Sequence, residues 1–331
     1  MDELKNISVV VPAYNNEKTI AATIEALLAQ DYPAENLEII IVDDGSNDRT
    51  GEIIKNYPVK YSYQDNKGPA AARNLGWRLS KGQIICFTDA DCIPEKQWVS
   101  KLCGEYTSDK IAGVGGSYRN ANSDNLLATC IHQEIIQRHL RIPKQVNYLG
   151  AFNVSYRRGV LEEIGGFNES YPDASCEDND IAYRIVKKGY KLIFDKDIRV
   201  GHHHPVRLLG YLRRQFWHGF WRMKLYRNHP DMAKGDVYAG LMDFIRPPLA
   251  MATICLLPLV FFRLAAYMFC FLLFLEGIMQ VFVPLSVIKR TRKLKYAFLI
   301  LITFFREYSR GVGMIVAIFR FFIYDALLKL E

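Results

Sequence analysis

The sequence predicts an α/β fold, in which a mostly parallel sheet is covered by helices on both faces, followed by an α-helical membrane region. Apolar runs of strand length alternate with helical patterns over residues 1–205, and polar clusters stand directly after several of these runs. From Phe244 onward the composition becomes almost wholly apolar. We therefore expect an α/β domain at 1–205, an amphipathic helix and linker at 206–243, and membrane-associated helices at 244–331.

The elements of the α/β domain can be taken in order. Apolar runs predict strands at Ile7–Val11, Leu37–Val42, Val59–Gln64 and Ile84–Thr88. Helical patterns between them predict helices near Thr19–Gln30, Thr50–Tyr57 and Pro69–Ser80. The later part is less regular, with a helix near Leu126–Leu140, a turn from Gly150 into a strand, and a helix starting near Asp178. Because ligands of such sheets bind beyond the carboxyl ends of the strands, the polar clusters there mark the candidate site.

The remaining segments predict membrane association. Arg207–Tyr226 has the composition of an interfacial amphipathic helix, although an ordinary surface helix packed on the domain is the alternative. Leu249–Phe262 and Leu264–Ile288 together fit two spans of roughly 20 residues each. The basic loop Lys289–Lys295 belongs in the cytoplasm, on the same side as the N-terminal domain if the two spans form a hairpin. Tyr296–Phe322 contains four charges and is either a third span or a helix lying on the membrane.

Composition narrows the possible functions. The formal net charge of +7 suits an anionic substrate or lipid, and no basic tail, zinc-finger spacing or RNP-like motif indicates nucleic acid. The seven cysteines are scattered without a CxxC pair, which argues against a disulfide framework and fits a reducing compartment. No signal-peptide pattern precedes the first strand, so we expect the first domain to stay in the cytoplasm.

A candidate metal site follows the fourth predicted strand. Asp89, Ala90 and Asp91 form a DxD sequence, whose two carboxylates can reach one hard divalent cation together with substrate phosphates. A solvated turn can have the same sequence. His202 and His204 share one face of a later extended segment, and a neutral imidazole there could complete the metal shell begun by Asp91.

Two further segments indicate nucleotide recognition. Asp43 and Asp44 follow the second strand, where a carboxylate can accept hydrogen bonds from a base or a ribose. The same segment also supplies helix caps, and the sequence alone does not separate the two aspartates. Lys67 and Arg73 flank a tight loop of small residues running into a helix, where both side chains can contact phosphate or base.

A candidate general base begins a later helix. Acidic residues favour a helix N-terminus by themselves, so Glu177 and Asp178 have a purely structural explanation. In the functional interpretation, one of the two carboxylates takes the proton from a reacting hydroxyl group.

Seven motifs in order resemble the family 2 glycosyltransferases, which are inverting enzymes of the GT-A fold. The resemblance covers about residues 5–225, roughly two thirds of the chain, and rests on VVVPAYNNEKTI, IIIVDDGSNDRT, NKGPAAARNLG, FTDADC, GAFNVSYRR, GGFNE and CEDNDIAYRIVKKGYK. It implies nucleotide-sugar contacts by the matching residues Pro12, Ala13, Tyr14, Glu17, Asp43, Asp44, Lys67, Arg73, Asp89 and Ala90. Within that set Asp44 matches the base-binding aspartate. Gly150 and Asn153 match a loop between donor and acceptor.

The resemblance also implies the chemistry. Asp91, Asp89 and His202 match the ligands of an Mg²⁺ or Mn²⁺ ion, with Asp91 as the preferred direct ligand. Asp178, with Glu177 beside it, matches the general base that deprotonates the acceptor hydroxyl. Attack from the face opposite the leaving nucleoside diphosphate would invert the anomeric centre.

The resemblance implies a hexosyltransferase that uses a UDP- or GDP-linked sugar. Because Arg213–Trp217 only partly matches the QxxRW motif of processive synthases, we expect a single transfer to a lipid-linked or polysaccharide acceptor. The expected location is the cell membrane, with several spans and a cytoplasmic catalytic domain. One alternative is a polyprenyl-phosphate glycosyltransferase, whose ionised acceptor needs no base. Another is an inactive scaffolding homologue, disfavoured because Asp89, Asp91 and Asp178 are present. A nucleotidyltransferase is disfavoured because Pro12–Tyr14 replaces a Gly-rich loop.

Overall fold

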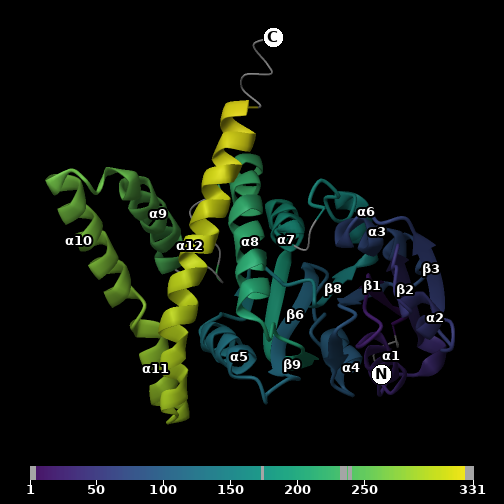
Figure 1. Cartoon of the computed structure of the whole chain (residues 1–331). Helices are drawn as coiled ribbons and strands as arrows, with labels where there is room; N and C mark the ends of the chain where they lie inside the picture. Colours follow the sequence, from purple (N-terminus) through teal and green to yellow (C-terminus); the bar gives the residue numbers. More distant parts are fainter. Residues whose placement is uncertain (1–4, 173–174, 232–236, 238–240, 325–331) are drawn as a thin grey trace. The chain divides into compact units, whose positions relative to one another are not determined.

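The computed structural model of the chain describes residues 5–172, 175–231, 237 and 241–324. The chain divides into two compact units (Figure 1). Unit 1 comprises Met1–Ala121 and Ile142–His203, and unit 2 comprises Asn122–Arg141 and His204–Glu331. The division into consecutive segments at 205 and 243 stays a prediction.

Unit 1 contains a mixed, mostly parallel sheet with the strand order β3-β2-β1-β4-β8-β6-β9-β5, and β7 pairs with β9 beside this path. The strands of the described residues are β1 Ile7–Ala13, β2 Leu37–Asp44, β3 Lys60–Gln64, β4 Ile84–Thr88, β5 Cys92–Pro94, β6 Ile111–Asn120, β7 Gln145–Val146, β8 Asn153–Arg157 and β9 Lys191–His202. Strands β1 to β4 pair in parallel, as do β6 and β9, whereas β8 is antiparallel to both β4 and β6. The predicted sheet is therefore confirmed.

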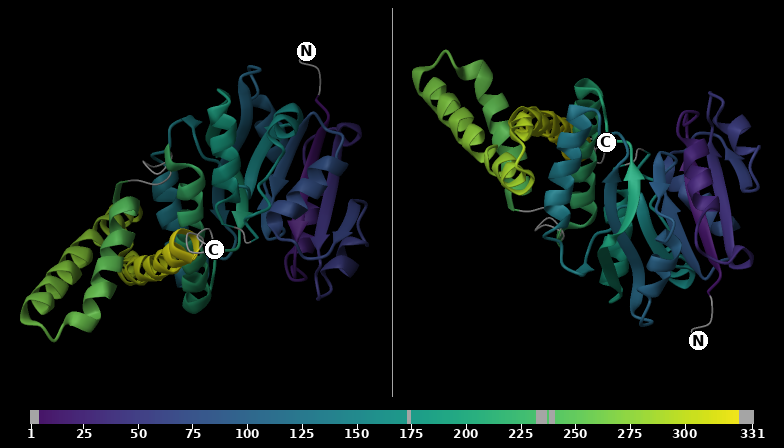
Figure 2. Two further views of the ribbon diagram at one scale, coloured as in Figure 1. Left: turned by 90° about the horizontal axis from the view of Figure 1, so that it is seen from above. Right: turned by 90° about the horizontal axis from the view of Figure 1, so that it is seen from below.

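Helices cover both faces of this sheet (Figure 2). One face carries α1 Ile20–Leu28, α2 Thr50–Ile54 and α4 Trp98–Gly104, and the other carries α3 Pro69–Leu79, α6 Arg158–Ile164 and α7 Glu177–Lys187. A short 3₁₀ turn, Ala34–Asn36, precedes β2. Alternate side chains of β1 explain the two layers: Val9 and Val11 are buried with α1, whereas Val10 is buried with Trp77 of α3. The predicted layering is confirmed.

Unit 2 is helical. It contains α5 Leu126–His139, α8 Leu208–Asn228, α9 Leu241–Leu256, α10 Arg263–Met279, α11 Phe282–Thr291 and α12 Leu299–Ile318, with short turns at Leu257–Leu259, Leu294–Phe298 and Phe319–Tyr324. Helices α8 and α12 lie side by side (Figure 1). A Cβ atom added to Gly219 of α8 would lie 2.2 Å from the carbonyl oxygen of Arg310, so the two backbones approach too closely for a larger residue.

The charges of α12 face the interior of unit 2. Arg306 Nη1 donates to both carboxylate oxygens of Glu134 on α5, at 2.7 and 2.6 Å, and Nη2 lies 3.0 Å from Glu307 Oε1. All three side chains are at most 4% exposed. Arg138 of α5 pairs in turn with Asp243 of α9 at 2.7 Å. Two of the four charges that made this segment ambiguous in the sequence, Arg306 and Glu307, therefore belong to internal ion pairs.

The helices α9 and α10 reverse the usual distribution of polar and apolar side chains. Glu276 is buried and accepts a hydrogen bond from the Thr253 hydroxyl at 2.6 Å. Large apolar side chains of the same region are exposed, among them Phe271 and Phe274. Within the described residues, one helical stretch, Arg263–Thr291, is long and apolar enough to cross a membrane, while the apolar stretch Ile245–Leu259 is shorter.

Candidate functional site

The metal motif forms the turn that connects β4 to β5. Cys92 N donates to Asp89 O at 3.0 Å and closes the turn, and Ala90 is buried, with its carbonyl oxygen accepting from the Thr23 hydroxyl at 3.0 Å. The side chains of Asp89 and Asp91 are 32% and 29% exposed. The turn therefore presents both carboxylates at the carboxyl end of a buried strand, while Ala90 is a packing residue.

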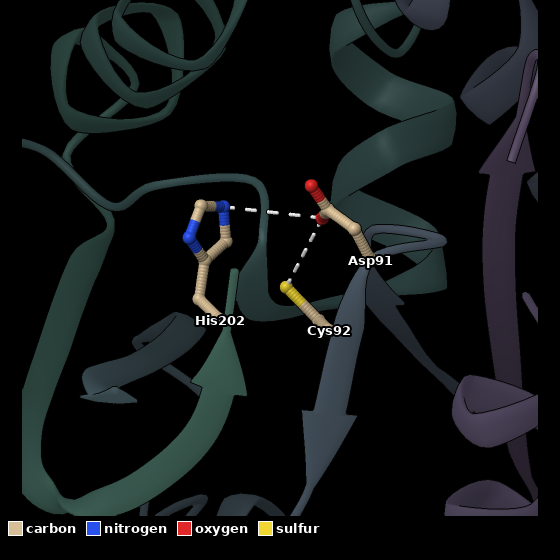
Figure 3. A group of neighbouring side chains, drawn as sticks. All are labelled: Asp91, Cys92 and His202. Atoms are coloured by element: carbon tan, nitrogen blue, oxygen red, sulfur yellow. Dashed lines mark hydrogen bonds and ion pairs between the residues drawn. The ribbon is translucent and has the colours of Figure 1, made fainter. Parts of the chain in front are cut away.

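Three side chains converge beside this turn (Figure 3). The antiparallel pairing of β5 with β9 places Cys92 opposite His202. Asp91 Oδ1 lies 3.9 Å from His202 Nε2 and 3.8 Å from Cys92 Sγ, and the three potential ligand atoms lie within 4.8 Å of one another. His203 Nδ1 lies 3.2 Å from the backbone carbonyl oxygen of Asp91, whereas His202 approaches the Asp91 carboxylate. This set of oxygen, nitrogen and sulfur atoms fits a divalent cation.

Cys92 is a neighbour of the metal motif that the sequence analysis missed. Its position directly after Asp91 was visible, but its approach to His202 depends on a strand pairing across more than 100 residues. Burial raises the pKa of the Cys92 thiol well above its ordinary value, so without a cation the group is neutral. Asp91 and His202, two of the three predicted ligands, are brought together.

Arg73, which the sequence predicts to contact phosphate or base, is directed toward two carboxylates of unit 1. It lies on α3 with a 2% exposed side chain, where Nη1 donates to Glu177 Oε1 at 2.9 Å and Nη2 donates to Asp89 Oδ1 at 2.8 Å. It therefore joins two predicted site residues from distant segments. Burial and, next, the charge of Asp178 raise the pKa of Glu177 to about 7, although Arg73 acts in the opposite direction.

Asp178 stands in the first turn of α7 and is partly exposed. Its Oδ2 accepts a hydrogen bond from the Tyr148 hydroxyl at 3.1 Å, and its Oδ1 accepts from the backbone N–H of Asn179 at 2.8 Å. Tyr148 was not predicted, because nothing in its sequence context distinguishes it from other loop tyrosines. Gly150 follows in the same loop, where an added Cβ would lie 2.5 Å from the ring of Phe152.

The two aspartates that end β2, Asp43 and Asp44, accept hydrogen bonds from the loops around them. Asp44 is buried and accepts hydrogen bonds from Gln64 Nε2 at 2.6 Å and from the backbone N–H groups of Lys67 and Gly68, both at 2.9 Å. Asp43 accepts from Ser46 N at 2.9 Å and, at 3.0 Å, from the hydroxyl of Tyr61 on β3. Both carboxylates thus fix the loops at the strand ends, and the Lys67 side chain remains exposed.

The segment after β1 completes this edge of the sheet. Pro12 and Ala13 end the strand, and Tyr14 follows with 44% of its surface exposed. Asn15 has φ +54° and its Oδ1 accepts from Asn47 N at 2.8 Å, which joins the loops after β1 and β2. Glu17 Oε2 lies 3.5 Å from Arg49 Nε in an exposed ion pair. These residues lie at the same edge of the sheet as the metal motif, because β1, β2 and β4 are parallel neighbours.

Asn153 is not brought to the exposed part of the site. It begins β8, is 1% exposed, and its Oδ1 accepts from Trp98 Nε1 at 2.8 Å. Its Nδ2 donates to the carbonyl oxygens of Ser117 and Ile198 at 2.9 and 3.0 Å. The amide therefore ties β8 to its neighbour β6 and also to β9, the strand on the other side of β6.

Comparison with known proteins identifies the class. The family model for glycosyl transferase family 2 matches residues 8–165. The chain is 30% identical over 258 residues to the probable glycosyltransferase YdaM of Bacillus subtilis, which covers 73% of this chain and 57% of that protein. It is 32% identical over 195 residues to the UDP-Glc:alpha-D-GlcNAc-diphosphoundecaprenol beta-1,3-glucosyltransferase WfaP of Escherichia coli, which covers 56% of this chain and 72% of that protein. The chain therefore belongs to the family 2 glycosyltransferases.

The fold agrees with this assignment. The mannosyltransferase PcManGT from Pyrobaculum calidifontis, solved in complex with GDP-Man and Mn²⁺, matches with a TM-score of 0.58 over 98% of this chain and 88% of that chain, at 18% identity. This likeness confirms the predicted GT-A fold. The matched part spans 57% of the length of the Bacillus subtilis relative and 51% of that of a pre-mycofactocin glycosyltransferase of Mycobacterium tuberculosis.

Proposed function

We propose that this chain is an inverting, metal-dependent glycosyltransferase that moves a sugar from a nucleotide sugar to a hydroxyl group of a lipid-linked or polysaccharide acceptor. The observation that carries the proposal is that Arg73 links two groups of carboxylates within unit 1. Asp89, next to the cation candidates Asp91 and His202, is joined through Arg73 to the helix that presents Asp178. This link supports a displacement reaction, which requires that leaving-group stabilisation and proton removal act beside each other.

The donor side would use the strand-end loops and the cation. Asp91 and His202 would hold an Mg²⁺ or Mn²⁺ ion, with Asp89 beside them, and such an ion neutralises the charge of a departing diphosphate. The exposed Tyr14 and Lys67 can meet the nucleoside and its phosphates. UDP is the favoured nucleotide, because the name of the Escherichia coli relative specifies a UDP-linked donor.

The acceptor side would use Asp178. Its partly exposed carboxylate can accept the proton of an acceptor hydroxyl, and the hydrogen bond from Tyr148 orients it for this task. A lipid-linked acceptor is supported by the diphosphoundecaprenol-linked substrate in the name of the Escherichia coli relative. The outward-facing apolar side chains of unit 2 support a location at a membrane, where a lipid-linked acceptor lies.

The test uses the full chain in detergent. A panel of nucleotide sugars is incubated with Mn²⁺, Mg²⁺ or EDTA, and release of nucleoside diphosphate is measured. We expect one donor to be turned over, with activity lost in EDTA and in Asp91→Ala. Asp109→Asn, which removes an exposed carboxylate outside the site, serves as the matched control. Absence of turnover together with absence of metal-dependent nucleotide binding would favour the scaffolding alternative.

The acceptor class is tested with a second variant. Asp178→Asn should lower transfer to a sugar hydroxyl by about 10² to 10⁴-fold, the usual contribution of general base catalysis. Transfer to a polyprenyl phosphate needs no base, because that acceptor is already ionised. Near-full transfer by Asp178→Asn to a polyprenyl phosphate would therefore favour the polyprenyl-phosphate alternative.

A further inference from the structure

Arg73 is a buried cation that binds two carboxylates from different parts of unit 1. One of them, Asp89, belongs to the turn after β4, and the other, Glu177, begins α7. The two donated bonds are 2.8 and 2.9 Å long and come from different nitrogen atoms of one guanidinium group. A single planar group therefore connects the metal-motif turn to the helix that presents Asp178.

The two carboxylates differ in exposure. The Glu177 side chain is 4% exposed, whereas that of Asp89 is 32% exposed and is engaged by Arg73 through Oδ1. Glu177 thus lies out of reach of a ligand, and Asp89 keeps an open side. Among the described residues, Arg73 Nε and Glu177 Oε2 have no hydrogen-bond partner, so each group uses its bonds within this bridge.

Direct binding of a donor by Arg73 conflicts with this arrangement. The Phe167 ring covers the guanidinium, with 5.6 Å between the guanidinium carbon and the ring centroid. Turning Arg73 toward a nucleotide would leave Glu177 as a buried charge without its cation, which is costly. The fork of an arginine can bind two carboxylates in fixed directions, and a lysine ammonium cannot reproduce that geometry.

We propose that Arg73 is a positioning residue that fixes the cation-binding turn relative to the Asp178 carboxylate, and that it is not a ligand of the donor. This inference rests on the proposed function, because it needs a reaction in which the cation-binding turn and the Asp178 carboxylate act together. A misplacement of about 1 Å between reacting groups can cost roughly 10²-fold in rate, so a bridge at this point has a catalytic consequence.

The experiment separates positioning from binding. Arg73→Lys and the control Arg78→Lys are compared for kcat on the identified donor and for the Kd of the Mn²⁺–nucleoside diphosphate complex by calorimetry. Arg78 lies on the same helix and is exposed, with a 3.8 Å ion pair to Glu169. We expect Arg73→Lys to lower kcat about 10- to 100-fold, while its Kd changes less than about threefold. Arg78→Lys should change neither quantity.

A second variant covers a folding defect. If Arg73→Lys does not fold, Glu177→Gln tests the same bridge, because the amide keeps the Oε1 acceptor and the shape but loses the charge. The expected pattern is again a lower kcat with an unchanged Kd. In addition, the double variant Arg73→Gln/Glu177→Gln is compared with the single variants Arg73→Gln and Glu177→Gln. It should lose about as much activity as the less active of the two single variants, because the two residues act as one unit.

Two results would overturn the positioning role. One is a Kd at least about tenfold weaker with kcat retained, which would make Arg73 a donor ligand. The other is unchanged kcat and Kd in Arg73→Lys. Wild-type turnover is measured first, and its absence with every donor would contradict the proposed function. If the wild type turns over a donor, either of the two results for Arg73→Lys contradicts only the positioning role of Arg73.

Discussion

At the scale of single residues, Glu177 makes the stability of unit 1 depend on pH. Burial and the Asp178 charge raise its pKa from 4.5 to about 7. Because the folded-state pKa lies above the unfolded one, the protonated group contributes stability that is complete below about pH 4.5 and is lost as the pH rises through about 7. We expect the Tm of the wild type to fall across this window, and that of Glu177→Gln to fall less.

The measurement is thermal unfolding in detergent at several pH values. Glu162→Gln is the control, since this glutamate is exposed on α6 and should follow the wild type. If the Tm of Glu177→Gln and that of the wild type changed with pH in parallel, Glu177 would be ionised throughout the range from about pH 4.5 to 7. Its pKa would then not be raised.

The same residues show that sequence motifs place site residues on elements without giving the direction of each side chain. Asp89 and Asp178 were predicted at a strand end and a helix start, and both have partly exposed carboxylates there. Arg73 and Asn153 were predicted beside the ligand but are buried, with partners inside unit 1. The direction of Arg73 is decided by Glu177, 104 residues away, and no local pattern encodes such a distance.

At the scale of elements, the contact between α8 and α12 depends on two glycines. An added Cβ at Gly219 or Gly313 would lie 2.2 or 2.1 Å from a carbonyl oxygen of the other helix. We expect Gly219→Ala to destabilise unit 2 by about 1–3 kcal/mol, because the backbones must separate. Gly210→Ala on the same helix meets no atom within 4 Å and should be neutral or slightly stabilising. Thermal unfolding of both variants in detergent measures the difference, and equal Tm values would contradict close packing.

The elements themselves were largely readable from the sequence. Strands β1, β2 and β4 are mostly apolar runs, and the parallel pairing of β1 to β4 follows from the helices between them. The antiparallel direction of β8 was not readable, because it is set by pairing with β4 and β6 rather than by its own composition. For the same reason, nothing in α5 indicates that it belongs with helices from the end of the chain.

At the scale of the whole molecule, unit 2 has the distribution of side chains that suits a lipid surrounding. Buried Glu276 and Thr253 bind each other, while Phe271 and Phe274 are exposed. The sequence predicted two spans from apolar length, and one stretch of the described residues meets that criterion. Composition could not assign α12, because only the buried pairing of Arg306 with Glu134 shows that its charges face inward.

Two native cysteines allow the membrane proposal to be tested without new substitutions in unit 2. Cys255 on α9 and Cys270 on α10 are exposed. If these helices lie in lipid, a membrane-impermeant maleimide should label both thiols at least about tenfold more slowly in liposomes than after denaturation, because the charged reagent does not enter the hydrocarbon. Lys18→Cys, on the exposed surface of unit 1, should label quickly in intact liposomes. Peptide mass spectrometry assigns each labelled site. Rapid labelling of both native thiols in intact liposomes would place α9 and α10 in water and contradict the membrane location.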